Sequence, residues 1–215
     1  MFGFLSGADS CDGPFSRPAR RVGTRSNRRH TRHVASRLFA LAVCRHNRTR
    51  SVLMANLFEH HAAAAGLANL TQSAGFSDGG EQPTDNTVRY LATRGIDVSD
   101  YLSLWMTDRS IRGAHLIFTA EKAHVIAIAG RWPDAFDYTF TLPELVQRGE
   151  AVGPRGERTL KEWLVAVNAG RPTTLDYLDA KVGEIADPTG RSPATWKVAF
   201  EQIDDLTKRL VTLLA

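Results

Sequence analysis

Residues 38–51 read LFALAVCRHNRTRS, and this stretch decides the fold because it joins a strand, a loop and a helix start. The first six residues are apolar, as in a buried strand, and a segment typical of a helix begins at Val52. Cys44 and Arg50 therefore lie in a loop before a helix N-terminus, where backbone N–H groups favour an anion. A thiolate and a guanidinium that face one phosphate-sized site predict chemistry on phosphate esters.

The polar residues of this loop suit that chemistry. Arg50 offers a planar fork for two phosphate oxygens, and Asn47 tolerates the left-handed backbone conformation that such a loop needs. Ser51 can donate its hydroxyl to the sulfur. A simpler interpretation stays open, because cysteine is among the most buried residue types and a Cys–Arg pair at this spacing arises easily in an arginine-rich chain.

The strand and helix patterns alternate from Arg37 onward, which is typical of a parallel sheet with helices on both faces. We expect Gly66, Gly95 and Gly130 to end helices and Pro83 to lie in a first helical turn. The predicted strands are 38–43, 67–74, 114–119 and 138–142, and the predicted helices are 52–65, 83–94, 121–129, 160–168 and 195–214.

Composition limits which other classes of protein the chain can belong to. A chain of 215 residues with 43% hydrophobic residues can bury one substantial core, and no run of about 18 apolar residues predicts a membrane span. The formal net charge is +4, yet residues 1–37 alone carry eight arginines against two aspartates, which leaves −2 for the rest. The basic charge therefore belongs to the N-terminal segment and argues against a nucleic-acid-binding domain.

Residues 1–36 are rich in Arg, Ser and Gly and predict a disordered extension ahead of one domain over residues 37–215. Arg20-Arg21 could open an export signal, but the apolar run that follows is too short. An organellar transit peptide or an over-long start stays open, and we favour a dispensable extension. Cys11 and Cys44 are the two cysteines, so we expect no disulfide framework and a cytoplasmic location. The histidines show no metal-binding spacing, and we expect no metal site.

Asp187-Pro188, before the last predicted helix, is a second candidate element. Cleavage of a phosphate ester needs a proton on the leaving oxygen, which a carboxyl group on a nearby loop can supply. Pro188 would restrict that loop and aim the acid. Asp-Pro is also a common turn dipeptide, so an ordinary turn is the alternative.

Together these elements resemble the low-molecular-weight protein tyrosine phosphatase family, from Arg37 to the C-terminus. The resemblance implies a three-layer α/β sandwich with a four-stranded parallel sheet, a phosphocysteine intermediate, a phosphorylated protein as substrate, and no metal or organic cofactor. The motifs that carry it occur in the family's order: Val43-Cys44 through Arg50-Ser51, Ser73-Ala74-Gly75, Arg94-Gly95-Ile96-Asp97 and Asp187-Pro188.

The resemblance also implies roles. Cys44 would be the nucleophile, Arg50 the phosphate clamp, and Asp187 the general acid that later activates water. Ser51 would stabilise the thiolate, and Asn47 would fix the loop through the supporting Ser73. The implied phosphate-binding residues are Arg45, His46, Asn47, Arg48, Thr49, Arg50 and Ser51.

Several departures leave the substrate open. The family often has a glycine at His46, an apolar residue at Arg48 and a second cysteine at Thr49. It also often places a histidine near Tyr101 and an aromatic residue after Asp-Pro, where this chain has Thr189. Two other functions stay open: arsenate reduction on the same fold, for which only Cys11 could resolve the intermediate, and a non-catalytic phosphate-loop or nucleic-acid-binding protein that uses the basic extension.

Overall fold

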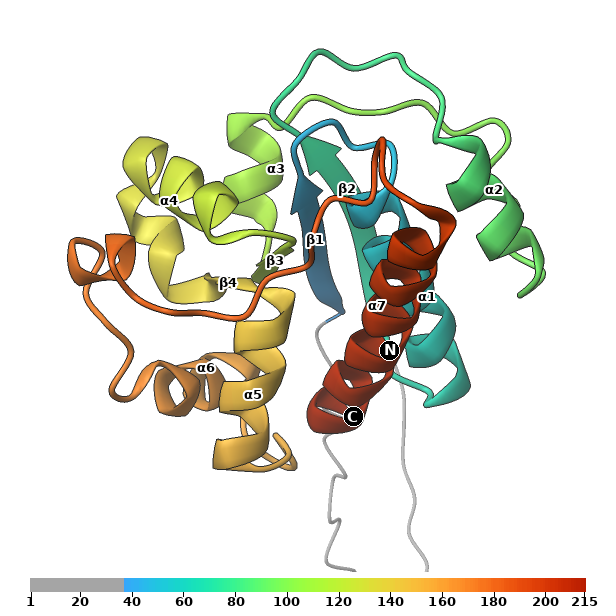
Figure 1. The fold of residues 1–215 in the computed structure, drawn as a ribbon. Coiled ribbons are helices and arrows are strands. Elements are labelled where there is room, and N and C mark those ends of the chain that lie inside the picture. Colours follow the sequence, from blue (N-terminus) through green and yellow to red (C-terminus); the bar gives the residue numbers. More distant parts are fainter. Residues whose placement is uncertain (1–36) are drawn as a thin grey trace, which may run out of the picture. The chain divides into compact units, whose positions relative to one another are not determined.

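A parallel sheet forms the centre of the computed structural model, which describes residues 37–215. Within these residues the sheet has four strands, in the order β2-β1-β3-β4, and every neighbouring pair is parallel (Figure 1). The predicted four-stranded parallel sheet is therefore confirmed. The strands are β1 (Leu38–Cys44), β2 (Asn69–Gly75), β3 (Leu116–Thr119) and β4 (Thr139–Thr141). The extension predicted over residues 1–36 lies outside the described residues.

Helices cover both faces of the sheet, as the alternating pattern predicted (Figure 1). Ala40 and Ala42 of β1 belong to the core shared with α1 (Arg50–Ala64), α5 (Leu142–Val152) and α7 (Pro193–Leu214). Leu41 and Val43 point to the opposite face, against α3 (Asp108–Gly113) and α4 (Lys122–Arg131). The remaining helices are α2 (Asp85–Ala92), α6 (Leu160–Asn168) and the 3-10 helices η1 (Pro133–Tyr138) and η2 (Asp176–Leu178).

The core fixes α1 firmly against the sheet. Leu53, Leu57 and Phe58 of α1 are fully buried, and the ring of Phe58 lies 5.5 Å from that of Phe118 on β3. Burying each such side chain contributes about 1.5–3 kcal/mol, so packing along the first half of α1 holds its start in place. This matters for function because α1 begins at Arg50.

Two expectations about helix ends are wrong. Gly130 does not end α4, which continues to Arg131 and stops at Trp132, because the following Pro133 cannot continue the same hydrogen-bonded ladder. Pro83 precedes α2, whose N-cap is Thr84. Gly66 and Gly95 do follow the ends of α1 and α2 with φ of 70° and 72°, as expected of glycines at helix ends.

Two helices are additional to those predicted. The six-residue α3 is too short to show a clear apolar period, and its start rests on a local hydrogen-bonded cap from Thr107. The other, α5, begins directly at the end of β4, where the hydroxyl of Thr141 accepts a hydrogen bond from the backbone N–H of Glu144. Among residues 37–215, no helix combines the length and the apolar character needed to cross a membrane.

Candidate active site

The loop of residues 44–51, called the anion loop below, connects the C-terminal end of β1 to the N-terminus of α1. In parallel α/β sheets this edge is where ligands bind. Arg50 and Ser51 already belong to the first turn of α1, so the N–H groups of that turn are available to an anion above Cys44. The sequence prediction of a strand, a loop and a helix start is confirmed at this point.

Cys44 lies at the base of the loop, and its residue surface is 3% exposed. Its Sγ is 3.0 Å from the Oγ of Ser51, a distance at which the hydroxyl can donate to a thiolate. Ser51 is itself fully buried and accepts a hydrogen bond of 2.9 Å from Nδ2 of Asn47. Cys44 is therefore not an isolated core cysteine but the first member of a polar chain.

Asn47 organises the loop from within. It is fully buried and has a φ of 52°, the left-handed conformation that the sequence predicted for it. Its Oδ1 accepts hydrogen bonds from the hydroxyl of Tyr101 at 2.6 Å and the backbone N–H of Leu104 at 2.7 Å. Ser73 touches Tyr101, with 2.8 Å between the two hydroxyl oxygens, and so reaches Asn47 through Tyr101 rather than directly.

Tyr101 is a residue that the sequence reasoning missed. Burial raises the pKa of its phenol above the ordinary value, although hydrogen bonds with Ser73 and Asn47 act in the opposite direction, so the group remains a neutral donor. The sequence offered one indication of its role: the family often has a histidine in this region, and this chain has none. The Tyr101 hydroxyl contacts Asn47 of the anion loop from that region.

Gly75 explains why the Ser73-Ala74-Gly75 step belongs to the site. A Cβ at this position would lie 2.8 Å from the carbonyl oxygen of Arg45 and 2.9 Å from the backbone nitrogen of Asn47. Only glycine allows β2 to approach the anion loop this closely. The next residue, Phe76, then donates its backbone N–H to the carbonyl oxygen of Arg45 at 2.8 Å.

Arg50 is the most completely enclosed charge of the site, with 2% of its surface exposed. Its Nη1 donates to the carbonyl oxygen of Ile185 at 2.9 Å and forms an ion pair with Glu121. Its Nη2 donates to Oδ2 of Asp187 at 2.6 Å. The guanidinium is thus held by two carboxylates from separate segments, and both must be considered when an anion binds.

Asp187 reaches the loop because its segment is anchored along the C-terminal ends of two strands. Ile185 donates its backbone N–H to the carbonyl oxygen of Ala120, which follows β3, and Thr141 of β4 donates its hydroxyl to the carbonyl oxygen of Gly183. The side chain of Asp187 is 42% exposed, and its Oδ1 accepts the backbone N–H of Thr189 at 2.9 Å. Pro188 between them is buried.

The carboxyl of Asp187 is predominantly ionised in this arrangement. Partial burial raises its pKa, but the hydrogen bonds from Thr189 and the charges of Arg50 and His46 outweigh burial and bring the pKa below the ordinary value. The sequence analysis placed Asp187 near the loop on the strength of the Asp-Pro pair. The structure brings it into direct contact with Arg50.

Glu121 was not identified from the sequence. It lies just beyond β3 at the N-terminus of α4, where its carbonyl oxygen accepts the backbone N–H of His124 at 3.1 Å and its own N–H donates to Nδ1 of His124 at 3.2 Å. Burial lowers the pKa of His124 to about 4. The carboxylates of Glu121 and Asp187 act to raise this pKa, and the nearby charges of Arg50 and Arg45 act to lower it. His124 is therefore a neutral ring, stacked 5.5 Å from Phe76.

The other residues predicted to bind phosphate line the mouth of the loop or turn away from it. Thr49 is buried, with its hydroxyl 3.1 Å from that of Thr84. Arg48 donates to the carbonyl oxygen of Gln82 at 2.8 Å. His46 is exposed and its Nδ1 lies 2.9 Å from the hydroxyl of Ser77. Arg45 is exposed, and its backbone rather than its side chain joins the loop to β2.

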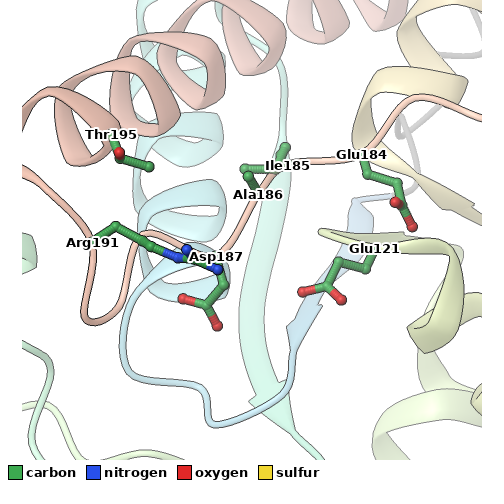
Figure 2. A pocket seen from close by; sticks show the side chains of 7 residues that line it. All are labelled: Glu121, Glu184, Ile185, Ala186, Asp187, Arg191 and Thr195. Carbon is green, nitrogen blue, oxygen red and sulfur yellow. The ribbon is translucent and has the colours of Figure 1, made fainter.

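Two cavities meet at Asp187. The smaller, about 70 Å³, lies over Cys44 and is lined by Cys44, His46, Arg48, Thr49, Arg50, Thr84, Asp187 and Thr189. The larger, about 460 Å³, has Glu121 and Glu184 on one side and Asp187, Arg191 and Thr195 on the other (Figure 2). Among the described residues, no Phe, Tyr or Trp side chain lines either cavity, and no group of three or more His, Cys, Asp and Glu residues could hold a metal ion.

Comparison with known proteins connects this geometry to one family. The sequence profile of the low molecular weight phosphotyrosine protein phosphatases matches residues 40–148, a span that includes the anion loop, Tyr101 and Glu121. Asp187 lies beyond the matched span. A comparison with curated proteins found no match.

Solved structures share the fold at low sequence identity. A low molecular weight protein tyrosine phosphatase from T. tengcongensis is 22% identical, with a TM-score of 0.61, over 81% of this chain and 97% of that one. The YwlE arginine phosphatase from Geobacillus stearothermophilus is 23% identical, with a TM-score of 0.58, over 81% and 90%. Vibrio vulnificus Wzb in complex with benzylphosphonate is 17% identical, with a TM-score of 0.58, over 81% and 97%. These similarities establish the fold.

Proposed function

Because the chain belongs to the low molecular weight phosphotyrosine protein phosphatase family, we propose that it is a phosphoric monoester hydrolase that dephosphorylates phosphotyrosine in proteins. The observation that carries the proposal is the buried chain Cys44–Ser51–Asn47 beside the guanidinium of Arg50. It supports the proposal because Cys44 and Arg50 line one small cavity, and Ser51 is within hydrogen-bond distance of the sulfur. The reaction uses no metal or organic cofactor.

In the first step, the thiolate of Cys44 attacks phosphorus. The S–P bond forms as the P–O bond to the leaving group breaks, and Asp187 donates a proton to the departing oxygen. Arg50 and the N–H groups of the anion loop bind the equatorial oxygens, where charge is spread in the transition state. Ser51, 3.0 Å from the sulfur, stabilises its negative charge before the attack.

In the second step, water cleaves the phosphocysteine. Asp187, now ionised, accepts a proton from the water as its oxygen attacks phosphorus. The sulfur leaves as a thiolate, again with the hydroxyl of Ser51 as its hydrogen-bond donor, and inorganic phosphate is released. A reaction that depends on a free thiol requires a reducing compartment, so the proposal includes the cytoplasm.

The test is hydrolysis of p-nitrophenyl phosphate and of phosphotyrosine peptides by the full chain, followed by mass spectrometry of the protein after rapid quenching. Cys44→Ser should abolish turnover and remove the phosphorylated protein species. Cys11→Ser is the matched control, because it removes the other cysteine of the sequence, and it should leave turnover intact. Turnover that survives Cys44→Ser would refute the mechanism.

Phosphoarginine is a second candidate substrate, favoured by the larger cavity. Glu121, Glu184 and Asp187 line it together with Arg191. Glu121 and Asp187 also pair with Arg50, so three carboxylates face two guanidinium groups, and a guanidinium leaving group would find a net opposite charge there. The arginine phosphatase from Geobacillus stearothermophilus shares the fold. Matched peptides carrying phosphotyrosine or phosphoarginine separate the two candidates. Glu184→Gln should lower activity on phosphoarginine alone if that is the substrate.

A further inference from the structure

We propose that a bound phosphate dianion displaces Asp187 from Arg50 and that Asp187 then takes up, from solvent, the proton it later delivers to the leaving group. The contact between Asp187 and Arg50 would thus occupy the part of Arg50 that binds the substrate. The inference rests on the proposed phosphatase function and concerns how the general acid acquires its proton.

The two edges of the Arg50 guanidinium are held differently. Nη1 contacts the carbonyl oxygen of Ile185 and the carboxylate of Glu121, and Glu121 is fixed at the N-terminus of α4 by its reciprocal hydrogen bonds with His124. Nη2 contacts only the carboxylate of Asp187 among the described residues. One edge is therefore anchored to the fold, while the other depends on a single, 42% exposed side chain.

The cavity over Cys44 lies on the Asp187 side of the guanidinium. Cys44, Arg50 and Asp187 all line it, whereas Glu121 lines only the larger cavity. An anion that approaches the sulfur therefore meets the Nη2 edge and competes with Asp187. A phosphate dianion brings two charges and several oxygens, and it also receives N–H groups of the anion loop that Asp187 does not use. Glu121 can hold Nη1 throughout the exchange.

The exchange changes the charge around Asp187. Before the exchange, its carboxylate faces Arg50 of α1, His46 of the anion loop, Glu121 at the start of α4, and Glu184 and Arg191 of its own segment. His124 lies behind Glu121. After exchange, Asp187 loses its direct partner and gains a dianion in a cavity of about 70 Å³. Both changes favour the protonated acid.

Thermodynamic linkage makes this measurable. If binding places one proton on Asp187, the affinity for a dianion must weaken as pH rises above the pKa of the free acid. The slope is about tenfold in dissociation constant per pH unit until the pKa of the complex is reached. Sulfate is a suitable dianion, because it remains doubly charged throughout this range and contributes no proton of its own.

The experiment titrates full-length Cys44→Ser with sulfate by calorimetry between about pH 4.5 and 6.5, above the ordinary carboxyl pKa. Two buffers of different ionisation enthalpy give the number of protons taken up. Cys44→Ser removes the thiol, and Cys44→Ala serves if the serine variant is unstable. We expect uptake approaching one proton and a dissociation constant that rises about tenfold per pH unit. Adding Asp187→Asn should remove both effects.

Two histidines near the site provide the controls. His46→Gln and His124→Gln, each added to Cys44→Ser, should leave the uptake in place, and its loss in either would overturn the proposal. Equal uptake with and without Asp187, or sulfate binding without any uptake, would also overturn it while leaving the proposed phosphatase function intact. Complete failure of sulfate to bind would refute the phosphate site itself, and the inference with it.

Discussion

The phenol of Tyr101 donates a hydrogen bond of 2.6 Å to the side-chain oxygen of Asn47, across 54 positions of sequence. The same hydroxyl lies 2.8 Å from that of Ser73. Asn47 in turn donates to Ser51, which contacts the sulfur of Cys44. The conformation of the anion loop is thereby tied to β2 and to the loop before α3 through a hydroxyl whose residue lines neither of the two cavities.

Tyr101→Phe removes this hydroxyl but keeps the ring. We expect kcat to fall about fivefold with a smaller change in KM, because a buried hydrogen bond of this kind is worth about 1 kcal/mol and the loop geometry matters most in the transition state. Steady-state kinetics on p-nitrophenyl phosphate measure the effect. Tyr138→Phe is the matched control, since the hydroxyl of Tyr138 makes no hydrogen bond within residues 37–215, and it should be neutral.

Tyr101→His tests the same brace from the other direction. The family often places a histidine in this region, and an imidazole N–H can donate to Asn47 as the phenol does. Partial recovery of kcat relative to Tyr101→Phe is expected. A phenylalanine variant with unchanged kcat would show that Leu104 and Ser51 hold Asn47 without help.

Asp187→Asn should slow phosphorylation of Cys44, because the variant cannot protonate the leaving oxygen. General acid catalysis contributes about 10²–10⁴-fold, and we expect the largest losses with phenyl phosphate, whose leaving group is more basic than p-nitrophenol. Pre-steady-state kinetics across substrates with different leaving groups measure this. Asp179→Asn alters an exposed acid in the same segment and should have no effect. A loss independent of the leaving group would place the acid elsewhere.

Gly75→Ala should damage the site through the backbone. The added Cβ would lie under 3.0 Å from the carbonyl oxygen of Arg45 and from the backbone nitrogen of Asn47, so β2 or the anion loop must move. We expect lower activity and a loss of stability of about 1–3 kcal/mol, measured by kinetics and urea denaturation.

Gly130→Ala is the contrasting change. This glycine lies inside α4 with nothing within 4 Å of the added Cβ. Alanine there should raise stability by about 0.5–1 kcal/mol and leave activity unchanged. Similar losses for both variants would indicate that glycine replacement in this protein acts through something other than the close approach at Gly75.

These residues also mark how far the sequence could predict the structure. The four strands and the strand–loop–helix around Cys44 followed from apolar patterns, because local hydrophobic periodicity directly reflects burial. Asn47 was predicted to be left-handed from its residue type. The contacts of Tyr101 and Glu121 were not predictable, since they depend on which loops meet at the C-terminal edge of the sheet. The helix boundaries predicted at Gly130 and Pro83 were wrong because flanking cap residues, rather than these two, set the boundaries.

His124 should make stability depend on pH. Burial lowers its pKa to about 4, against 6.5 for the ordinary side chain, so between these values the unfolded chain binds more protons than the folded protein. Stability from this residue is therefore complete above about pH 6.5 and is lost as pH falls towards 4, by about 2 kcal/mol between pH 7 and 5.

Urea denaturation at several pH values should show this decline in the wild type and a flatter profile in His124→Gln. His60→Gln replaces an exposed histidine and should retain the wild-type decline. A profile that is equally steep in His124→Gln would assign the pH dependence to other groups.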